Sequence, residues 1–406
     1  MSGRLRFYRR DRMPSKPKSS RPRILMAAYQ IRNKSNGGME SATRIFEALR
    51  TQFDWSLVTT REMPRTERWR RGGSRVTVTP FDDAKPSWFR RMQGIVWSAR
   101  LGLEILRFRP SVVHCNDIQS FRALSLLPAW LRRAPLIFTL RDTRPPGNRP
   151  GPVWQKLLRH ARRIVVLSRD MGARFSDDIP GAEGKIVVIN SIVDLESNAP
   201  IGHHQRLKTR ARLGIQPDEF AVVCIGAVGE KKRQLELVRN IWPLVTRNVP
   251  SATLHLLGDC PEDDPYCSSV ALAVKTSPSA DSVFVRGHIE SMPEWYQAAD
   301  LICINARNEG LARAMIEGMS SGTPVVSTDV CSAREMLEET GAGLVVPRDQ
   351  PEALAHAICE MTDPDVARIA GRKGRKVAIQ RFSQDSVADA WRALYRETAH
   401  SNPLDN

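Results

Sequence analysis

The stretch LICINARNEGLARAMIEGMSSGTPVVST, residues 301–328, has the pattern of a strand, a helix and a second strand. The run 301–306 is mostly apolar, and the run 324–328 that ends the stretch is rich in β-branched residues. The segment LARAMIEGMSS between them predicts a helix. A helix that connects two strands in this way places them parallel in one sheet. The stretch therefore predicts an α/β fold built on a parallel sheet.

The same alternation of strand and helix patterns runs through all 406 residues. Most strand patterns are apolar on both faces, which is typical of a parallel sheet covered by helices. The chain is too long for one hydrophobic core, and a polar segment without a strand pattern separates two series of strands. We therefore predict two doubly wound domains in tandem. The expected division is a basic disordered tail at 1–22, an N-terminal domain at 23–198, a linker at 199–217, a C-terminal domain at 218–385, and a closing helix and tail at 386–406 that return to the N-terminal domain.

The charge is distributed unevenly along the chain. Residues 1–200 hold 38 Lys and Arg against 17 Asp and Glu, a net +21, while residues 201–406 hold 23 against 27, a net −4. A basic half of this kind favours an anionic partner, which is a nucleic acid, a membrane surface or a phosphorylated substrate. No apolar run reaches the roughly 18 residues that a membrane span needs, and we expect no signal peptide. Seven cysteines without paired spacing indicate reduced thiols in the cytoplasm.

Two carboxylates flank the start of the helix predicted at 311–321. Glu309 lies in the loop after the strand, and Glu317 follows eight residues later, which is about 12 Å along a helix. Gly310 lets the backbone approach a ligand closely, and free amides near Leu311 and Ala312 suit an anion. A nucleoside diphosphate sugar matches this layout, because its sugar and ribose hydroxyls flank a diphosphate. The alternative is a surface helix with two solvated acids.

A second loop carries a candidate phosphate ligand. Gly226 follows a predicted strand, and Lys232 stands just before a helical run. A lysine at this point reaches phosphate as a point charge, although Lys231 and Lys232 in isolation would be read as a solvated pair.

Together these motifs resemble glycosyltransferase family 4. The stretches that carry the resemblance are GAVGEKKRQLELV (226–238), ADLICINARNEGLARAMIEGMSSGTPVVSTDV (299–330), AREMLEETGAGLVVP (333–347) and, more loosely, SNGGME (35–40). The resemblance covers nearly the whole chain and implies the GT-B fold, in which two doubly wound parallel-sheet domains face each other across a cleft. It implies an N-terminal domain that binds the acceptor and a C-terminal domain that binds the nucleotide sugar. The implied reaction is a retaining, metal-independent sugar transfer that uses no cofactor besides the nucleotide-sugar donor.

The resemblance also implies roles for individual residues. Glu309 would contact the donor sugar, Glu317 the ribose and Lys232 the diphosphate. The expected catalytic set is Glu309, Lys232, Asp142 and Arg141. The expected donor-binding set is Glu309, Gly310, Leu311, Ala312, Glu317, Gly226, Lys232, Arg233, His288 and Arg307. The expected acceptor or phosphate loop is Gly37, Gly38 and Glu40, and no metal ligands are expected.

The chain departs from the family pattern at three positions. Ala227 stands where the family usually has an arginine, so one cation for the diphosphate is missing, and Arg307 or Arg313 would have to compensate. Arg233 replaces the usual glycine after the lysine. Arg141 replaces a common histidine, and an always-charged arginine cannot abstract the acceptor proton. An anionic acceptor or the leaving phosphate would suit Arg141 instead.

Several other motifs are assigned structural roles. Asp363 and Asp365 spell the Asp-x-Asp of metal-dependent transferases but are interpreted as a helix cap. His203 and His204 lack further metal ligands, and His114 is expected to pack within a strand. Asn190 and Asp194 fall in the family's inter-domain pattern and are also expected to be structural.

The segment KPSWFRRMQGIVWSARLGLEILRFRP, residues 85–110, favours contact with an anionic membrane. Apolar residues recur in it at helical spacing and are flanked by arginines, as in an interfacial helix, and the basic tail would add attraction. Those apolar residues are Trp88, Met92, Ile95, Ala99, Leu103 and Leu106, with Trp69 nearby in the sequence. The alternative is that this stripe packs on the sheet and the arginines are solvated.

The leading prediction is therefore a glycosyltransferase that uses a UDP- or GDP-sugar and a saccharide or lipid-linked acceptor. We expect it in the cytoplasm, peripheral at the inner face of the plasma membrane, in the assembly of lipopolysaccharide, exopolysaccharide or glycolipid. The alternatives are a non-catalytic protein of the same fold, a sugar-nucleotide epimerase, and a nucleic-acid-binding protein, for which only the charge argues. The sequence leaves the sugar, the acceptor and the oligomeric state open.

Overall fold

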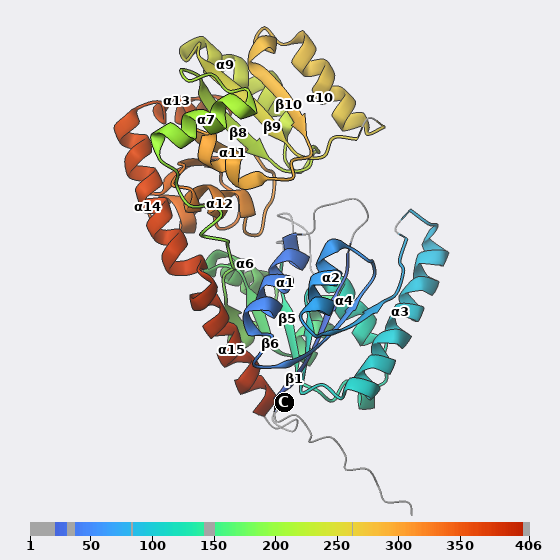
Figure 1. Cartoon of the computed structure of the whole chain (residues 1–406). Helices are drawn as coiled ribbons and strands as arrows, with labels where there is room; N and C mark the ends of the chain where they lie inside the picture. The colour runs from blue at the N-terminus through green and yellow to red at the C-terminus, as the bar shows by residue number, and fades with distance from the viewer. Residues whose placement is uncertain (1–20, 31–36, 83, 142–150, 262, 401–406) are drawn as a thin grey trace, which may run out of the picture.

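The computed structural model describes residues 21–30, 37–82, 84–141, 151–261 and 263–400. Within them lie two open sheets, one in each of two stacked domains (Figure 1). Every strand pairing in the described residues is parallel. The prediction of two doubly wound parallel-sheet domains is therefore confirmed.

The N-terminal sheet has seven strands, and the central ones are buried on both faces. The strands are β1 (Arg23–Ala28), β2 (Asp54–Thr59), β3 (Arg75–Val78), β4 (Val112–Cys115), β5 (Leu136–Thr139), β6 (Ala161–Val166) and β7 (Ile186–Val188), in the order β3-β2-β1-β4-β5-β6-β7. The helices are α1 (Gly37–Leu49), α2 (Pro64–Arg71), α3 (Ser87–Phe108), α4 (Ile118–Ser125), α5 (Pro152–His160) and α6 (Arg169–Asp178), with single turns at Ala129–Leu131 and Glu183–Lys185. From Ile24 onward every side chain of β1 is buried, as the apolar run RILMAA requires in a sheet covered by helices on both sides.

The C-terminal sheet has six strands in the order that a doubly wound fold gives. They are β8 (Phe220–Ile225), β9 (Ala252–Leu257), β10 (Val283–Gly287), β11 (Leu301–Ile304), β12 (Val325–Thr328) and β13 (Gly343–Val346), in the order β10-β9-β8-β11-β12-β13. The helical segments are α7 (His203–Leu213), α8 (Gln234–Glu236), the π-helix Leu237–Ile241, α9 (Trp242–Asn248), α10 (Pro265–Thr276), the turn Ala280–Ser282, α11 (Met292–Ala298), α12 (Arg313–Ser320), the π-helix Arg334–Glu338, α13 (Pro351–Glu360), α14 (Pro364–Phe382) and α15 (Gln384–His400). The predicted unit at 301–328 is thus β11, α12 and β12.

The segment 199–217 differs from the expected linker because it contains α7, which packs against α11. The guanidinium of Arg210 on α7 is buried and binds the Asp300 carboxylate at 2.9 Å. Carbonyl oxygens of Ala298, Gln216 and Glu219 also accept hydrogen bonds from this guanidinium. A buried charge is stable only when it is paired in this way, so α7 is an integral part of the C-terminal domain.

The last two helices connect the domains (Figure 1). α14 packs on α12 of the C-terminal domain, and α15 crosses to α1 and β4 of the N-terminal domain. Ser383 between them has an extended backbone, which interrupts the helix for one residue. Trp391 of α15 stacks on His114 of β4 with ring centroids 5.0 Å apart. The N-terminal core therefore includes side chains from the end of the chain.

His114 is packed rather than catalytic, as the sequence analysis predicted. Its ring nitrogens hydrogen-bond the hydroxyls of Tyr395 and Thr139, both at 2.7 Å. Burial, together with the charge of Arg141, holds the pKa of His114 well below its usual range, so the ring is neutral.

Candidate active site

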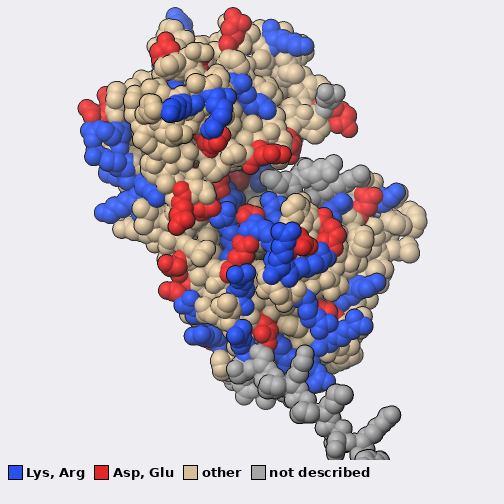
Figure 2. All heavy atoms as spheres, viewed as in Figure 1, with Lys and Arg blue, Asp and Glu red and all other residues tan. Residues whose placement is uncertain are grey.

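The carboxyl ends of both sheets face each other across a groove between the domains, with acidic and basic side chains on its walls (Figure 2). In open parallel sheets, ligands bind at this edge because the loops after the strands converge there. The loops that follow β8 and β11 reach the groove from the C-terminal domain. The start of α1 and the end of β5 reach it from the N-terminal domain.

The loops after β8 and β11 bring together the two main predicted donor residues. The ammonium of Lys232 lies 2.8 Å from Oε1 of Glu309, and Lys231 is farther away at 4.0 Å. The side chain of Glu309 is only 12% exposed. A partly buried ion pair of this geometry holds both side chains in fixed positions. The sequence predicted both residues individually, but the pairing comes from the fold.

Glycine at position 226 is favoured by the backbone conformation there, and the Lys232 side chain crosses directly over it. The backbone of Gly226 has φ 141°, and a Cβ there would lie 2.7 Å from Cε of Lys232. A side chain here would be strained by this φ and would also displace the end of the Lys232 side chain. Gly226 therefore positions Lys232 through the space that it leaves free.

The backbone after Glu309 offers unpaired amides to the groove. Leu311 and Ala312 precede α12, and their amides have no acceptor among the described residues. The carbonyl of Gly310 accepts a hydrogen bond from the Ser332 hydroxyl at 2.9 Å, and Ser332 contacts Ser168 of the N-terminal domain at 2.5 Å. The loop is therefore fixed by side-chain contacts while its amides stay available for an anion.

Glu317 is held by two neighbours. Its Oε2 accepts a hydrogen bond from the Tyr296 hydroxyl at 2.7 Å, and its Oε1 pairs with Arg313, one helical turn earlier. Burial, with the adjacent Glu317 charge, raises the pKa of Tyr296 well above its usual range. Arg313 is an i,i+4 partner that spacing alone predicts, whereas Tyr296 comes from α11 and has no signal in the sequence near Glu317.

Replacing Glu317 by alanine is expected to weaken nucleotide binding and also to destabilise the fold. The alanine variant leaves the buried Tyr296 hydroxyl without its acceptor, at a cost of about 1–3 kcal/mol. Tyr296→Phe separates the two effects, because it removes the same hydrogen bond and keeps the carboxylate. Calorimetric titration with the nucleotide should show a loss of affinity for Glu317→Ala that Tyr296→Phe does not share. Equal affinities for the two variants would contradict a ribose contact at Glu317.

Three other predicted donor residues lie at the edge of this loop cluster. Arg233 pairs with Asp349 at 2.7 Å. Its backbone is left-handed at φ 56°, which explains why the family usually has a glycine at this position. Arg307 contributes its backbone, since its amide donates to the Lys231 carbonyl at 2.8 Å. His288 is exposed and lies 2.9 Å from Asp259. Arg233 and His288 thus contact carboxylates of the protein itself in this structure.

The N-terminal wall of the groove is built on Gly37, Gly38 and Arg141. A Cβ at Gly37 would lie 3.1 Å from Cδ of Arg313, so the glycine permits close approach of the two domains. Arg141 donates to the Asn116 side-chain oxygen, and Asn116 donates to the Gly38 carbonyl at 3.2 Å. The chain Arg141–Asn116–Gly38 was not foreseen from the sequence. Asp142 lies outside the described residues.

Arg141 is a strongly desolvated cation. Burial lowers its pKa to about 10, the charge of Asp117 opposes that shift, and the charge of Arg313 adds to it. Burial raises the pKa of the Asp117 carboxyl to about 6, although hydrogen bonds from Ser120 oppose this. The two arginines from opposite domains therefore make this part of the groove favourable for an anion.

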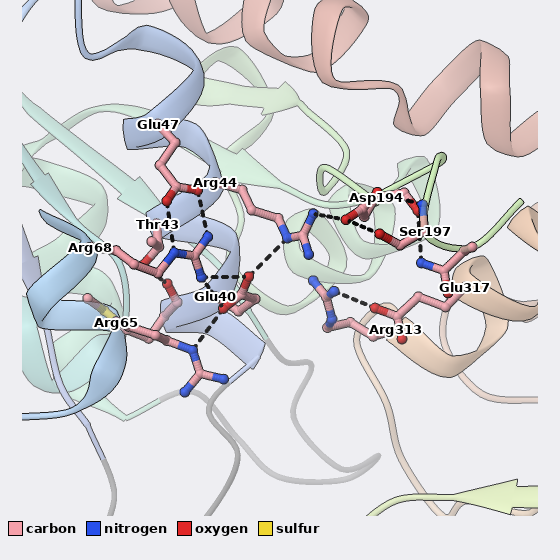
Figure 3. Close-up of polar contacts among 12 residues, drawn as sticks. Glu40, Thr43, Arg44, Glu47, Arg65, Arg68, Asp194, Ser197, Arg313 and Glu317 are labelled. Carbon is pink, nitrogen blue, oxygen red and sulfur yellow. Dashed lines mark hydrogen bonds and ion pairs between the residues drawn. The ribbon is translucent and has the colours of Figure 1, made fainter. Parts of the chain in front are cut away.

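Glu40 is placed differently from a ligand-facing acid, because arginines of its own domain surround it (Figure 3). It accepts hydrogen bonds from Arg44 at 3.0 Å, Arg65 at 2.9 Å and Arg68 at 3.2 Å. Burial alone would raise the pKa of Glu40, but the Arg65 hydrogen bond and the charges of Arg68 and Arg44 outweigh it and lower the pKa to about 2. Glu40 therefore organises a basic cluster on α1 and α2 beside the Arg313–Glu317 pair.

This pKa predicts how Glu40 affects acid stability. The folded pKa of about 2 lies below the usual 4.5, so the stabilisation is present above pH 4.5 and is lost as the pH falls from 4.5 toward 2. Glu40→Gln should lower the free energy of unfolding by about 2 kcal/mol at pH 7. Urea unfolding measured from pH 7 to pH 2.5 should show the two proteins converging at the acid end. A constant difference across this range would contradict the ionic origin, and Glu67→Gln on α2 is the matched control.

The motifs interpreted as structural have structural partners. Asp363 caps α14 by accepting from the amides of Asp365 at 2.8 Å and Val366 at 3.3 Å, which confirms the predicted cap. Asn190 donates to the Leu167 carbonyl, and Asp194 accepts from Ser197. No group of three or more His, Cys, Asp or Glu side chains in the described part of the chain could hold a metal ion.

Comparison with known proteins gives the family. A model described as glycosyl transferases group 1 matches residues 219–363, and one described as a glycosyl transferase 4-like domain matches residues 36–190. The chain belongs to the glycosyltransferase 4-like family. The two matches cover the C-terminal sheet with the Glu309 and Lys232 loops, and the N-terminal sheet with Gly37 and Arg141. The resemblance stated from the motifs is confirmed.

Curated relatives agree with this assignment, and a solved structure shares the fold. The chain is 26% identical over 271 residues to D-inositol 3-phosphate glycosyltransferase of Jonesia denitrificans, covering 62% of each chain. It is 26% identical over 294 residues to the lipopolysaccharide core biosynthesis mannosyltransferase LpsB of Rhizobium meliloti, covering 71% of this chain and 81% of LpsB. The crystal structure of Anabaena HepE in complex with UDP and glucose has a TM-score of 0.79 at 17% identity, covering 93% of this chain and all of HepE. At that identity the structural likeness supports the GT-B fold alone.

Proposed function

We propose that this protein transfers a sugar from a UDP- or GDP-sugar to a saccharide or lipid-linked acceptor, with retention of configuration, in the assembly of cell-surface polysaccharide or glycolipid. The observation that carries the proposal is the Lys232–Glu309 pair, set at the carboxyl ends of β8 and β11 beside the free amides of Leu311 and Ala312. A family relative that acts in lipopolysaccharide core synthesis supports the acceptor class.

In the proposed donor complex each of these groups has a separate task. Lys232 exchanges its contact with Glu309 for the diphosphate, and the amides of Leu311 and Ala312 bind the same phosphates. Glu309, released from the lysine, accepts hydrogen bonds from the donor-sugar hydroxyls. Glu317 accepts from the ribose. The Lys232–Glu309 pair therefore keeps both side chains in place before the donor arrives, which lowers the cost of ordering them.

The proposed transfer needs no protein base. The acceptor hydroxyl oxygen forms its bond to the anomeric carbon on the face from which the nucleotide leaves. The bond between that carbon and the β-phosphate oxygen breaks, and this oxygen takes the hydroxyl proton. Arg141 and Arg313 face the same part of the groove, so they stabilise the negative charge of the leaving diphosphate or of an anionic acceptor.

Titration with UDP and with GDP, followed by nucleotide release from a panel of nucleotide sugars, tests the proposal. We expect one nucleotide to bind and its sugar conjugate to be hydrolysed slowly without an acceptor. Binding without release for every sugar would favour the alternative of a non-catalytic protein of this fold. Absence of binding to either nucleotide would contradict the donor site.

We also propose that α3 places the enzyme on an anionic membrane, in keeping with a lipid-linked acceptor and a location at the inner face of the plasma membrane. Trp88 and Ile95 are each 62% exposed, and Met92, Leu103 and Leu106 are exposed on the same helix. Trp97, Leu101, Ile105 and Phe108 make the buried contacts of α3 instead. The exposed apolar face lies among arginines, which suits an interfacial helix. No helix in the described part of the chain is long and apolar enough to span a membrane.

Trp69 does not belong to this membrane-facing surface, contrary to the expectation from the sequence. It is buried, stacks on Phe46 with ring centroids 4.1 Å apart, and donates to the Thr43 hydroxyl at 3.0 Å. It belongs to the N-terminal core and is not available to a membrane. The basic tail at 1–22 falls almost wholly outside the described residues. Deletion of residues 1–22 in the flotation experiment below measures its contribution to membrane binding.

Flotation with vesicles tests the membrane proposal. The protein should float with vesicles that contain an anionic lipid at low salt and be released at high salt, because each cation near such a surface contributes about 1 kcal/mol. Arg90→Glu with Arg91→Glu should reduce flotation several-fold. Arg239→Glu with Arg247→Glu is the matched control, since these exposed arginines lie on the C-terminal domain. Absence of flotation at low salt would contradict membrane binding and favour a soluble acceptor.

A further inference from the structure

The N-terminal domain has a second hollow on the side opposite the groove, at the amino ends of its strands. Its volume is about 430 Å³, and it lies between the starts of β1, β2 and β3 and the ends of α1 and α3. The donor and acceptor loops follow the carboxyl ends of the same strands, so this hollow is separated from the groove by the length of the sheet. The charged residues of its lining are Arg21, Arg23, Arg50, Asp54, Arg75 and Arg107.

The charge of the lining is strongly positive, since five arginines face a single carboxylate, Asp54. Arg23 and Arg75 have clear structural partners. Arg23 donates to the Phe108 carbonyl at 2.8 Å and so caps the end of α3, and Arg75 lies 3.4 Å from the buried carboxylate of Glu104. Folding alone accounts for these two residues.

Contacts within the fold do not explain Arg50 and Arg107 in this way. Both are exposed, and neither has a hydrogen-bond or ion-pair partner among the described residues. Arg50 directly follows α1, and Arg107 lies in the last turn of α3. The negative end of each helix dipole favours a cation at these positions. That stabilisation is only about 0.3–1 kcal/mol at an exposed site. It does not explain why both arginines line the same hollow.

The shape of the hollow also favours a ligand. One side is formed by the turn Gly72–Ser74, where a Cβ at Gly73 would meet nothing within 4 Å. A Cβ at Gly72 would lie 2.5 Å from the Phe46 ring, so the turn rests directly on an aromatic floor. Phe53 and Trp55 continue that floor and are buried. A buried aromatic floor with exposed arginines at the rim leaves room for a small anion.

We propose that this hollow is a binding site for a phosphate-bearing anion with two or more negative charges, separate from the donor site. Guanidinium groups bind phosphate in bidentate fashion, and Arg50 and Arg107 supply two of them from the ends of α1 and α3. The anion is either a free phosphorylated metabolite or the headgroup of an anionic lipid. The second source fits the geometry of α3, because Leu103 and Leu106 are exposed on the same end of the helix as Arg107.

Calorimetric titration of the full chain with inorganic pyrophosphate at low salt tests the site. Arg50→Gln with Arg107→Gln should weaken binding at least tenfold, and Lys232→Ala should leave this binding in place because it alters only the donor site. The matched control is Arg239→Gln with Arg247→Gln, which removes the same charge from exposed positions of the C-terminal domain. Equal affinity in the Arg50/Arg107 and Arg239/Arg247 variants would overturn the proposal, and so would a loss of all pyrophosphate binding in Lys232→Ala.

A vesicle experiment distinguishes the two sources of the anion. Flotation is compared on phosphatidylcholine vesicles with and without phosphatidic acid. If Arg50→Gln with Arg107→Gln floats less than the Arg239/Arg247 control on phosphatidic acid, the ligand is a lipid headgroup. If both variants float alike while pyrophosphate binding is lost in the first, the ligand is a free phosphorylated metabolite.

Discussion

Replacing Lys232 by alanine is expected to lower kcat/KM at least 100-fold. With Ala227 at the position of the usual arginine, Lys232 is the main cation of the loop after β8 that is proposed to bind the diphosphate. Removing one preoriented charge from a leaving group costs about 3–4 kcal/mol of transition-state stabilisation, or a factor of 10²–10³. The rate of transfer or of donor hydrolysis measures the effect.

Lys231→Ala is the control for this prediction. It removes the neighbouring charge, which is 48% exposed and 4.0 Å from Glu309, and it should change the rate less than threefold. A near-native rate in Lys232→Ala would show that Arg307 or Arg313 binds the diphosphate instead. A matching loss in both variants would indicate that general charge near the loop, rather than the ion pair over Gly226, is what matters.

Trp391→Ala is expected to destabilise the protein by about 3–5 kcal/mol, as truncation of a large buried aromatic side chain does. Trp391 is 1% exposed, stacks on His114 and lies 5.3 Å from the Tyr395 ring. The same residue anchors α15 on the N-terminal domain, so its loss should also loosen the attachment between the domains. The midpoint of urea unfolding measures the first effect, and protease cleavage within 383–400 measures the second.

A phenylalanine at this position is the informative control. The indole Nε1 of Trp391 has no hydrogen-bond partner among the described residues, so Trp391→Phe loses some packing but no hydrogen bond. It should cost less than half as much as alanine and leave the cleavage rate near that of the native protein. If alanine and phenylalanine behaved alike, the anchoring role assigned to the stacked ring would be wrong.

The sequence by itself determined the sheet type and the place of the loops that are proposed to bind the donor. Runs such as 301–306 are apolar on both faces, and only a parallel sheet covered by helices buries both. Because such a sheet gathers its loops at the carboxyl edge, Glu309 and Lys232 could be placed at the site without a structure. The cap at Asp363 was equally predictable, since capping depends on a few adjacent residues.

Only the tertiary structure decided which of these residues meet. Lys232 and Glu309 come from different strand–helix units, and the chain Arg141–Asn116–Gly38 joins the segments after β5 and β4 to the start of α1. Spacing carries no information about such pairs because they depend on strand order. Glu40 shows the same limit, since the three arginines that pair with it come from two helices and form an ion cluster around it.

The face of α3 that packs on the sheet was also beyond the sequence. The helix carries two apolar stripes, one through Trp88, Met92 and Ile95 and one through Trp97 and Leu101. Helical periodicity identifies both but does not say which one faces the core. The sheet settles it by burying Trp97 and Leu101 and leaving Trp88 and Ile95 exposed. Local pattern fixes the form of each element, whereas the burial of one face over another depends on the surface that the rest of the chain presents.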